Sequence, residues 1–259
     1  MITLIKLGGS LITDKTKELH FREDVMNRLA QDIASVIQNQ PELQLIIGHG
    51  SGSFGHTEAH KYKTIQGVHS QEEWMGFAKV AQVASQLSFL VTGALLDANV
   101  PIFRVQPSAA TLVEDSTAVA MNIQNMKLAL SHGLIPLIHG DVGFDTKQGG
   151  TITSTETLFT YLVKNLNVSR IILLGEVDGV LDLDQCVIPH ITPDTLENYA
   201  DALGRSKGVD VTGGMYQKVL DMVNLVRDYP QVSITIANGL HEGILIHLLS
   251  GNTNIGTTI

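Results

Sequence analysis

Hydrophobic residues along this chain follow two alternating patterns, which predict the order of its secondary structure. Short continuous apolar runs predict buried strands at residues 2–7, 43–47, 101–105, 134–138, 170–174, 232–237 and 255–259. Between these runs, apolar residues at three- and four-residue steps and the flanking turn residues predict helices at 22–38, 71–98, 121–131, 153–166, 193–203, 215–229 and 240–249.

This alternation of strand and helix predicts an α/β fold, a three-layer αβα sandwich around a largely parallel sheet. Residues 2–47 would form its first strand–helix–strand unit, with a right-handed crossover. No linker, internal repeat or low-complexity tract divides the 259 residues. We therefore expect a single domain over residues 1–259, with an N-terminal lobe of about 1–166 and a C-terminal lobe of about 167–259.

The composition narrows the class of protein. Asp and Glu total 26 against 17 Lys and Arg, a formal charge of −9, which argues against a nucleic-acid-binding protein. No apolar run reaches the ~18–20 residues of a membrane span, and the N-terminus lacks the pattern of a signal peptide. Cys186 is the only cysteine, so an internal disulfide is impossible. We expect a cytoplasmic protein with no nucleic-acid or membrane partner.

Glycine-rich segments follow the first two predicted strands. In the segment 48–56, glycines stand at positions 48, 50, 52 and 55, and His56 comes last. Backbone N–H groups of such a loop approach an anion closely, and the N-terminus of a following helix adds a favourable dipole. Histidine donates to phosphate near neutral pH. We expect this loop to hold a phosphorylated substrate, and Gly8-Gly9-Ser10 to hold the phosphate that is transferred to it.

Three lysines accompany these loops. Lys6 interrupts an apolar strand, and an unpaired buried ammonium is costly, so we expect a partner for it, for which phosphoryl groups are suitable. Lys15 follows in a polar segment, and Lys218 begins a predicted helix. Asp141, after Gly140, is a candidate to hold the lysines by charge-assisted hydrogen bonds, with a turn or helix cap as the alternative.

Other chemistries fit the sequence less well. Residues 50–55 match the dinucleotide fingerprint G-x-G-x-x-G, but the acidic residues at the right distance, Glu72 and Glu73, stand at a predicted helix start. A dehydrogenase and a ligand-free glycine turn are the alternatives at this segment. The sequence lacks a P-loop motif, a serine-hydrolase elbow and the Cys/His spacing of a zinc site, and we predict no metal-ligating side chain.

Several of these motifs occur together in an order that resembles the amino acid kinase superfamily, and the resemblance covers the whole chain. They are residues 6–10, the glycine loop 48–56, Gly140-Asp141, residues 177–180, Gly213-Gly214-Met215 with Lys218, and Gly256-Thr257 with Ile259. Within the superfamily, the segment 53–56 followed by Ala59, Lys61 and Tyr62 is similar to the isopentenyl phosphate kinases.

The resemblance implies a reaction and its partners. ATP with Mg²⁺ would be the phosphoryl donor, and isopentenyl phosphate or a related prenyl monophosphate would be the acceptor. The N-terminal lobe would bind the acceptor, the C-terminal lobe the nucleotide, and the assembly would be a homodimer. A fosfomycin-type phosphonate kinase of the same fold and a non-catalytic nucleotide or metabolite sensor are the alternatives.

The resemblance also implies roles for individual residues. Those that line ATP would be Lys6, Leu7, Gly8, Gly9, Ser10, Gly52, Glu176, Leu181, Gly214 and Lys218. Lys15 would stabilise the transition state, Ser51 and Gly140 would contact the acceptor through backbone amides, and His56 would donate to its phosphate. The chain departs from the usual pattern at Ser51, where Gly is usual, and at Glu176 and Leu181, where Asp and Tyr are common.

The alkyl tail of such an acceptor requires an apolar pocket. The predicted helix around residues 77–95 and the segment 119–130 are the candidates. One face of the helix 71–98 consists largely of small residues, which would suit a subunit contact, a border of the tail or an ordinary core helix.

Overall fold

The computed structural model describes residues 1–204, 214–251 and 254–259 of the chain. Its large sheet has seven strands in the order β11-β10-β9-β1-β2-β6-β3. Neighbouring strands run parallel, except that β10 and β11 are antiparallel. The strands are β1 (Ile2–Leu7), β2 (Gln44–His49), β3 (Ile102–Arg104), β6 (Ile135–His139), β9 (Val168–Gly175), β10 (Ser233–Asn238) and β11 (Thr257–Thr258). The expected strands of the parallel sheet are therefore confirmed.

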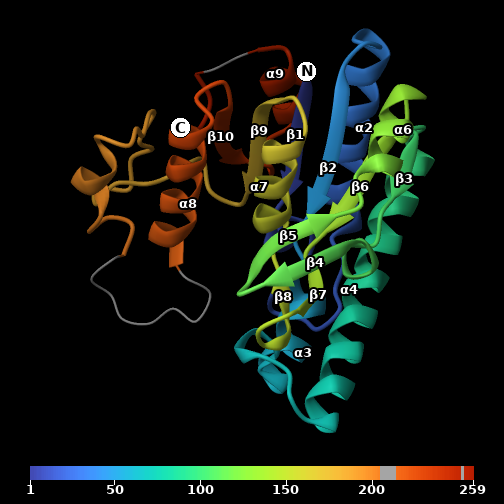
Figure 1. The fold of residues 1–259 in the computed structure, drawn as a ribbon. Coiled ribbons are helices and arrows are strands. Elements are labelled where there is room, and N and C mark those ends of the chain that lie inside the picture. The colour runs from blue at the N-terminus through green and yellow to red at the C-terminus, as the bar shows by residue number, and fades with distance from the viewer. Residues whose placement is uncertain (205–213, 252–253) are drawn as a thin grey trace.

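Helices cover both faces of this sheet (Figure 1). Neighbouring residues of a strand face opposite sides, so Ile5 of β1 packs in one apolar cluster and Leu4 in the other. The first cluster includes residues of α2 (Glu23–Asn39), α4 (Gln71–Asp97) and α9 (Ile244–Leu249). The second includes residues of α6 (Gln124–Ser131), α7 (Thr155–Asn165) and α8 (Gly214–Asp228). The predicted three-layer αβα architecture is confirmed.

A second, four-stranded sheet was not expected from the sequence. Its order is β5-β4-β7-β8, formed by β4 (Thr111–Glu114), β5 (Thr117–Met121), β7 (Asp141–Asp145) and β8 (Gly149–Thr153), with α5 (Pro107–Ala110) leading into β4. These strands are only four or five residues long, and only β4 strictly alternates buried and exposed positions, so the sequence carries no clear two-residue period.

Two predicted helices are shorter than expected. The stretch 193–203 contains only the 3₁₀ helix η2 (Leu196–Tyr199), and the stretch 240–249 becomes helical only at α9. Gly239 precedes this late start, and a Cβ atom there would clash with the side chain of Leu11. The chain between Gly239 and Gly243 forms a turn after β10.

The glycine segment after β2 is shorter than predicted, because a helix begins inside it. The short helix α1 (Gly9–Ile12) follows β1, whereas α3 (Gly52–Tyr62) and η1 (Thr64–Gln66) follow β2. The Gly55 N–H donates to the Ser51 carbonyl at 3.2 Å, and the buried Phe54 anchors this first turn. Gly55 and His56 therefore lie in α3, and the loop itself is Gly50-Ser51.

By length and composition alone, α4 is long and apolar enough to cross a membrane, although polar residues interrupt its apolar runs. Leu87, Val91 and Leu95 of α4 are buried in the same cluster as β1 and β2. This packing is that of a core helix. No other helix among the described residues meets the same criterion.

Candidate active site

Four strands of the large sheet end together at one edge. The register pairs Leu7 of β1 with His49 of β2 and with Leu174 of β9, and it pairs His49 with His139 of β6. The loops that follow these residues therefore start side by side. Open α/β sheets bind their ligands at this carboxyl edge.

The two glycine loops contact each other backbone to backbone. A Cβ atom on Gly50 would lie 2.8 Å from the Gly9 nitrogen, and one on Gly9 would lie 2.7 Å from the Gly52 Cα atom. The Gly50 N–H also donates to the Leu7 carbonyl at 3.0 Å. Only glycine permits this approach. The contact between the two loops therefore explains why glycine stands at positions 9 and 50.

Thr13, which the sequence analysis did not single out, links the two loops. Its buried hydroxyl donates to the Gly9 carbonyl at 2.7 Å and accepts from the Ser53 N–H at 2.9 Å. The first turn of α3 is thus fixed against α1. A threonine in a polar segment carries no local signal of such a role.

Lys6 forms an ion pair with Glu156 in the first turn of α7. Their side chains are only 17% and 22% exposed. Burial acts to raise the pKa of Glu156, but the positive charge and hydrogen bond of Lys6, with a smaller contribution from Lys218, outweigh burial and lower it. Glu156 is therefore an ionised counter-ion near both lysines. The sequence around Glu156 does not reveal this role, because an acidic residue in a first helical turn also suits the helix dipole.

Among the described residues Asp141 forms no ion pair with the lysines, and its hydrogen bond with Ser108 in the first turn of α5 matches the alternative stated for it, a helix cap. Its buried carboxylate accepts from the Gln106 side chain at 2.9 Å, the Ser108 N–H at 3.1 Å and the Val142 N–H at 2.9 Å. Burial raises the pKa of Asp141, although these hydrogen bonds oppose the shift. Gln106 also contacts Ser85 of α4 at 3.0 Å, so Asp141 connects β7 to α4 instead.

Two buried histidines, His49 and His139, end the strands β2 and β6 that precede the loops. The rings of His49 and His139 stack with centroids 5.4 Å apart, and burial lowers the pKa of each to about 3, so both are neutral. The Gly140 N–H donates to the His49 carbonyl at 2.9 Å, as does the Thr155 hydroxyl at 2.7 Å. The Gly140 N–H is therefore already hydrogen-bonded within the chain, which contradicts its predicted donation to the acceptor substrate.

The remaining residues predicted on the acceptor side lie in the segments that follow β1 and β2. Ser51 immediately precedes α3 and is half-buried. Lys15 is exposed in the turn after α1. His56 lies in α3, and its side chain is outside the described structure. Their roles remain predictions.

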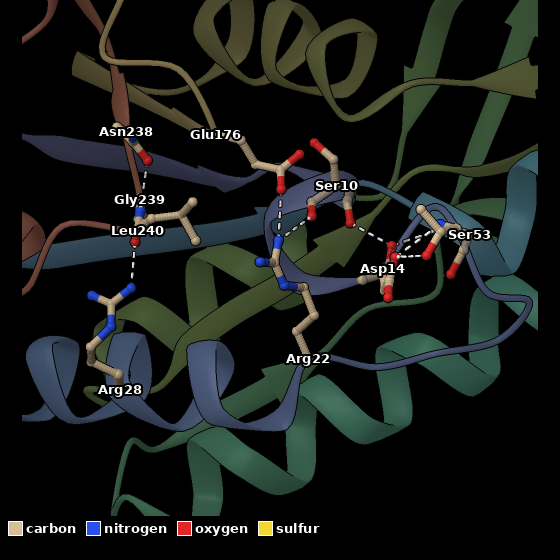
Figure 2. Close-up of polar contacts among 12 residues, drawn as sticks. Ser10, Asp14, Arg22, Arg28, Ser53, Glu176, Asn238, Gly239 and Leu240 are labelled. Atoms are coloured by element: carbon tan, nitrogen blue, oxygen red, sulfur yellow. Dashed lines mark hydrogen bonds and ion pairs between the residues drawn. The ribbon is translucent and has the colours of Figure 1, made fainter.

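The residues predicted on the nucleotide side follow β1 and β9. Gly8 donates to the Leu174 carbonyl at 2.8 Å, which brings the first glycine loop against the end of β9. Glu176 follows there and accepts from Arg22 at 2.6 Å, and Arg22 also donates to the Ser10 carbonyl at 3.2 Å (Figure 2). Arg22 was not among the residues predicted from the sequence.

The other nucleotide-side residues lie farther along the chain. Leu181 pairs with Val187 in a short bridge after β9. Gly214 is the first residue of α8, and the exposed Lys218 lies within that helix. Gly213 lies outside the described residues.

Among the residues that the structure describes, no group of three or more His, Cys, Asp or Glu side chains is arranged to hold a metal ion. Mg²⁺ in phosphoryl transfer binds largely to substrate phosphates and water, with one or two carboxylates. The side chains at this edge thus fit an ion that enters with a nucleotide rather than one held in a protein cage.

The family model described as the amino acid kinase family matches residues 1–238. The chain belongs to the amino acid kinase family. Two relatives are the isopentenyl phosphate kinases of Methanocaldococcus jannaschii, 31% identical over 86% of each chain, and of Haloferax volcanii, 33% identical over 86% of this chain and 88% of that protein. A solved structure titled "X-ray structures of isopentenyl phosphate kinase" aligns over 100% of both chains with a TM-score of 0.79 and 26% identity.

Within this amino acid kinase fold, the geometry suits the transfer of a group between two anions. Two glycine loops in direct contact lie at the N-termini of α1 and α3, where glycine lets the backbone approach an anion closely. Lys6 lies near the end of β1, just before the first loop, and Lys15 and Lys218 are exposed. The neutral His49 and His139 add no charge.

Proposed function

We propose that this chain transfers the γ-phosphoryl group of ATP to isopentenyl phosphate and so forms isopentenyl diphosphate. The observation that carries the proposal is the contact of the Gly8–Ser10 and Gly50–Gly52 loops, which suits two phosphate groups placed end to end. The two archaeal relatives at 31% and 33% identity, both isopentenyl phosphate kinases, support the choice of acceptor.

The chemistry requires little of the protein beyond position and charge. The acceptor phosphate is an anionic nucleophile at pH 7, so no general base is needed. Its oxygen attacks the γ-phosphorus, the bond to the β-phosphate oxygen breaks, and ADP leaves. Lys6, Lys15 and Lys218 would offset the repulsion between the two anions, and His56 would donate to the acceptor phosphate. Mg²⁺, bound with ATP, would neutralise further charge.

Glu156 has a defined place in this mechanism. Because it pairs with Lys6 and its pKa responds to the charge of Lys218, it would hold the first ammonium and orient the second toward the phosphates. In our proposal, the segment 1–166 provides the acceptor site and the segment 167–259 most of the nucleotide site. Glu156 lies near the junction of the two.

The alkyl tail would lie against an apolar cluster beside the acceptor loop. Phe77 and Val80 of α4 pack with Val142 of β7, and the partly buried Ile152 of β8 joins them. Val142 follows Asp141, so the cluster begins directly beside the carboxyl edge of β6. We expect Phe77→Ala to shift preference toward longer prenyl monophosphates, and an unchanged preference across such a panel would place the tail elsewhere.

We further propose that the chain forms a homodimer. The small residues of α4 do not provide the surface, because Ser88 is buried and Ser85 hydrogen-bonds to Gln106 within the chain. Large apolar side chains are instead exposed along the edge that α4, β3 and α6 share in Figure 1: Phe89, Leu96, Phe103 and Leu128. If the wild type sediments as a dimer and Phe89→Glu as a monomer, the result would support this surface. A monomeric wild type would refute the proposed dimer.

An assay of ADP release tests the proposed reaction against its alternatives. With Mg-ATP, we expect turnover of isopentenyl phosphate and a much lower kcat/KM for fosfomycin. The reverse preference would assign the chain to the phosphonate kinases. ADP release with neither acceptor would favour a sensor.

A further inference from the structure

Arg22 connects the two loops at which the nucleotide is proposed to bind. It lies directly before α2, and its Nη1 atom donates both to the Ser10 carbonyl at 3.2 Å and to Glu176 Oε1 at 2.6 Å. Ser10 follows β1, and Glu176 follows β9, the parallel neighbour of β1. Figure 2 shows the side chain reaching from α2 to both residues.

The position of Arg22 at the N-terminus of α2 does not stabilise the helix. A cation at a helix N-terminus opposes the helix dipole, whereas Glu23 and Asp24 in the same turn suit it. The Arg22 N–H donates to the Ile12 carbonyl at 2.9 Å, which fixes its backbone beneath α1. The chain therefore places an unfavourable charge here and anchors it against the first glycine loop.

The Arg22 guanidinium has N–H groups beyond those used in these two hydrogen bonds. Its two hydrogen bonds among the described residues both use Nη1, although arginine has five N–H groups. The Arg22 side chain is 29% exposed, so the unused face is accessible. A planar guanidinium with free N–H groups is well suited to bind phosphate.

We infer that Arg22 is a nucleotide-binding residue whose guanidinium, oriented by Glu176 and Ser10, donates to a phosphate oxygen of ATP bound at the Gly8–Ser10 loop. This inference rests on the proposed function only in placing ATP at that loop. Arg22 also neutralises Glu176, whose carboxylate would otherwise face the phosphates unpaired. The identity of the acceptor does not enter.

Arg28 provides a matched control on the same helix. Its guanidinium donates to the Gly239 carbonyl at 2.6 Å and the His241 carbonyl at 2.9 Å, so it ties α2 to the loop after β10. Figure 2 shows it reaching Gly239, on the far side of Glu176 from Asp14 and Ser53. Arg28→Met removes an arginine from α2 without touching the glycine loops.

The test is calorimetric titration of the full chain with Mg-ATP in the absence of acceptor, with thermal unfolding of each variant. We expect Arg22→Met to weaken ATP binding by about ten-fold or more, since a lost hydrogen bond to a charged group has that effect. Arg22→Lys should recover part of the affinity, because it restores the charge but not the fork. Arg28→Met should bind ATP within about two-fold of the wild type, since the hydrogen bonds of Arg28 go to the carbonyls of Gly239 and His241 and not to the glycine loops.

Steady-state kinetics add a second readout. The KM for ATP should rise in Arg22→Met while the KM for isopentenyl phosphate stays unchanged. Wild-type affinity for ATP in Arg22→Met, or an equal loss in Arg28→Met, would overturn the inference. A wild-type protein that binds ATP without phosphorylating isopentenyl phosphate would refute the proposed function, and the titrations would still test Arg22.

Discussion

Lys6 at the end of β1 and Glu156 in the first turn of α7 form an ion pair, although 150 positions separate them in the sequence. The pair lies on the central strand of the large sheet, beside the first glycine loop. Because Lys218 also lowers the pKa of Glu156, one carboxylate is the counter-ion of lysines from two distant parts of the chain. This arrangement holds a cation beside the loops before any substrate arrives.

Glu156→Gln tests the shared counter-ion. Glutamine keeps the size of the side chain but leaves Lys6 without its negative partner, so we expect kcat to fall by roughly 10- to 100-fold. The KM for isopentenyl phosphate should change less than kcat. Glu72→Gln, at an exposed position in the first turn of α4, is the control and should match the wild type. Wild-type kcat in Glu156→Gln would show that Lys6 needs no counter-ion for catalysis.

Lys15→Ala tests the transition-state cation. Lys15 is exposed in a turn that the Asp14 N–H closes on the His20 carbonyl at 3.0 Å, so the fold should not depend on its side chain. We expect kcat to fall on the order of 100-fold, the usual effect of removing one donor to a developing charge. Lys17→Ala, in the same turn and paired with Asp14, should retain kcat. An equal loss in both variants would indicate a general effect of the turn's charge.

The sequence predicted the parts of the fold that depend on local patterns. The apolar runs of β1, β2 and β9 and the period of α2 and α4 each carry their signal within a short window. The glycines at the ends of β1 and β2 likewise marked the loops, because backbone contacts there exclude any Cβ atom.

The contacts between distant segments were not predictable in the same way. Nothing near Lys6 indicates that its partner is Glu156, and nothing near Asp141 indicates Gln106 and Ser108. The hydrogen bonds of Thr13 and Arg22 also depend on which loops the sheet order brings together. The site was thus predicted by residue type, and its connections required the fold.

Gly9→Ala tests the contact between the glycine loops. A Cβ atom there would lie 2.7 Å from the Gly52 Cα atom, so the loops must separate. We expect a loss of stability of about 1–3 kcal/mol, as for other overpacked sites, together with a loss of kinase activity. Gly93→Ala in α4, where nothing within the same chain lies within 4 Å, should instead stabilise the helix of the monomer by about 0.5–1 kcal/mol. Urea unfolding of both variants measures the difference, and an active, stable Gly9→Ala protein would contradict the close contact.

Asp145→Asn tests the turn contacts of the small sheet. The Asp145 carboxylate is buried and accepts from the N–H groups of Ser116 at 2.8 Å and Lys147 at 2.8 Å, and from those of Asp115 and Gln148. Burial acts to raise its pKa, but these donors outweigh burial and lower it. Asparagine cannot accept from all of them, so we expect a loss of about 1–3 kcal/mol at pH 7.

The pH dependence of this loss follows from the lowered pKa. A carboxyl group whose pKa is lower in the folded state stabilises the fold above its unfolded pKa of about 4, and this contribution disappears as the pH falls through the folded value. The difference between wild type and Asp145→Asn should therefore shrink below about pH 4. Asp97→Asn, exposed at the end of α4, should show no such dependence, and a pH-independent difference for Asp145→Asn would contradict the assignment.

Phosphorus NMR of a reaction containing the protein, Mg-ATP and isopentenyl phosphate tests the central claim most directly. The account predicts that the monophosphate resonance is replaced by the two coupled resonances of a diphosphate, in equal amount to the ADP formed. Persistence of the isopentenyl phosphate signal while ATP is hydrolysed to inorganic phosphate would contradict it.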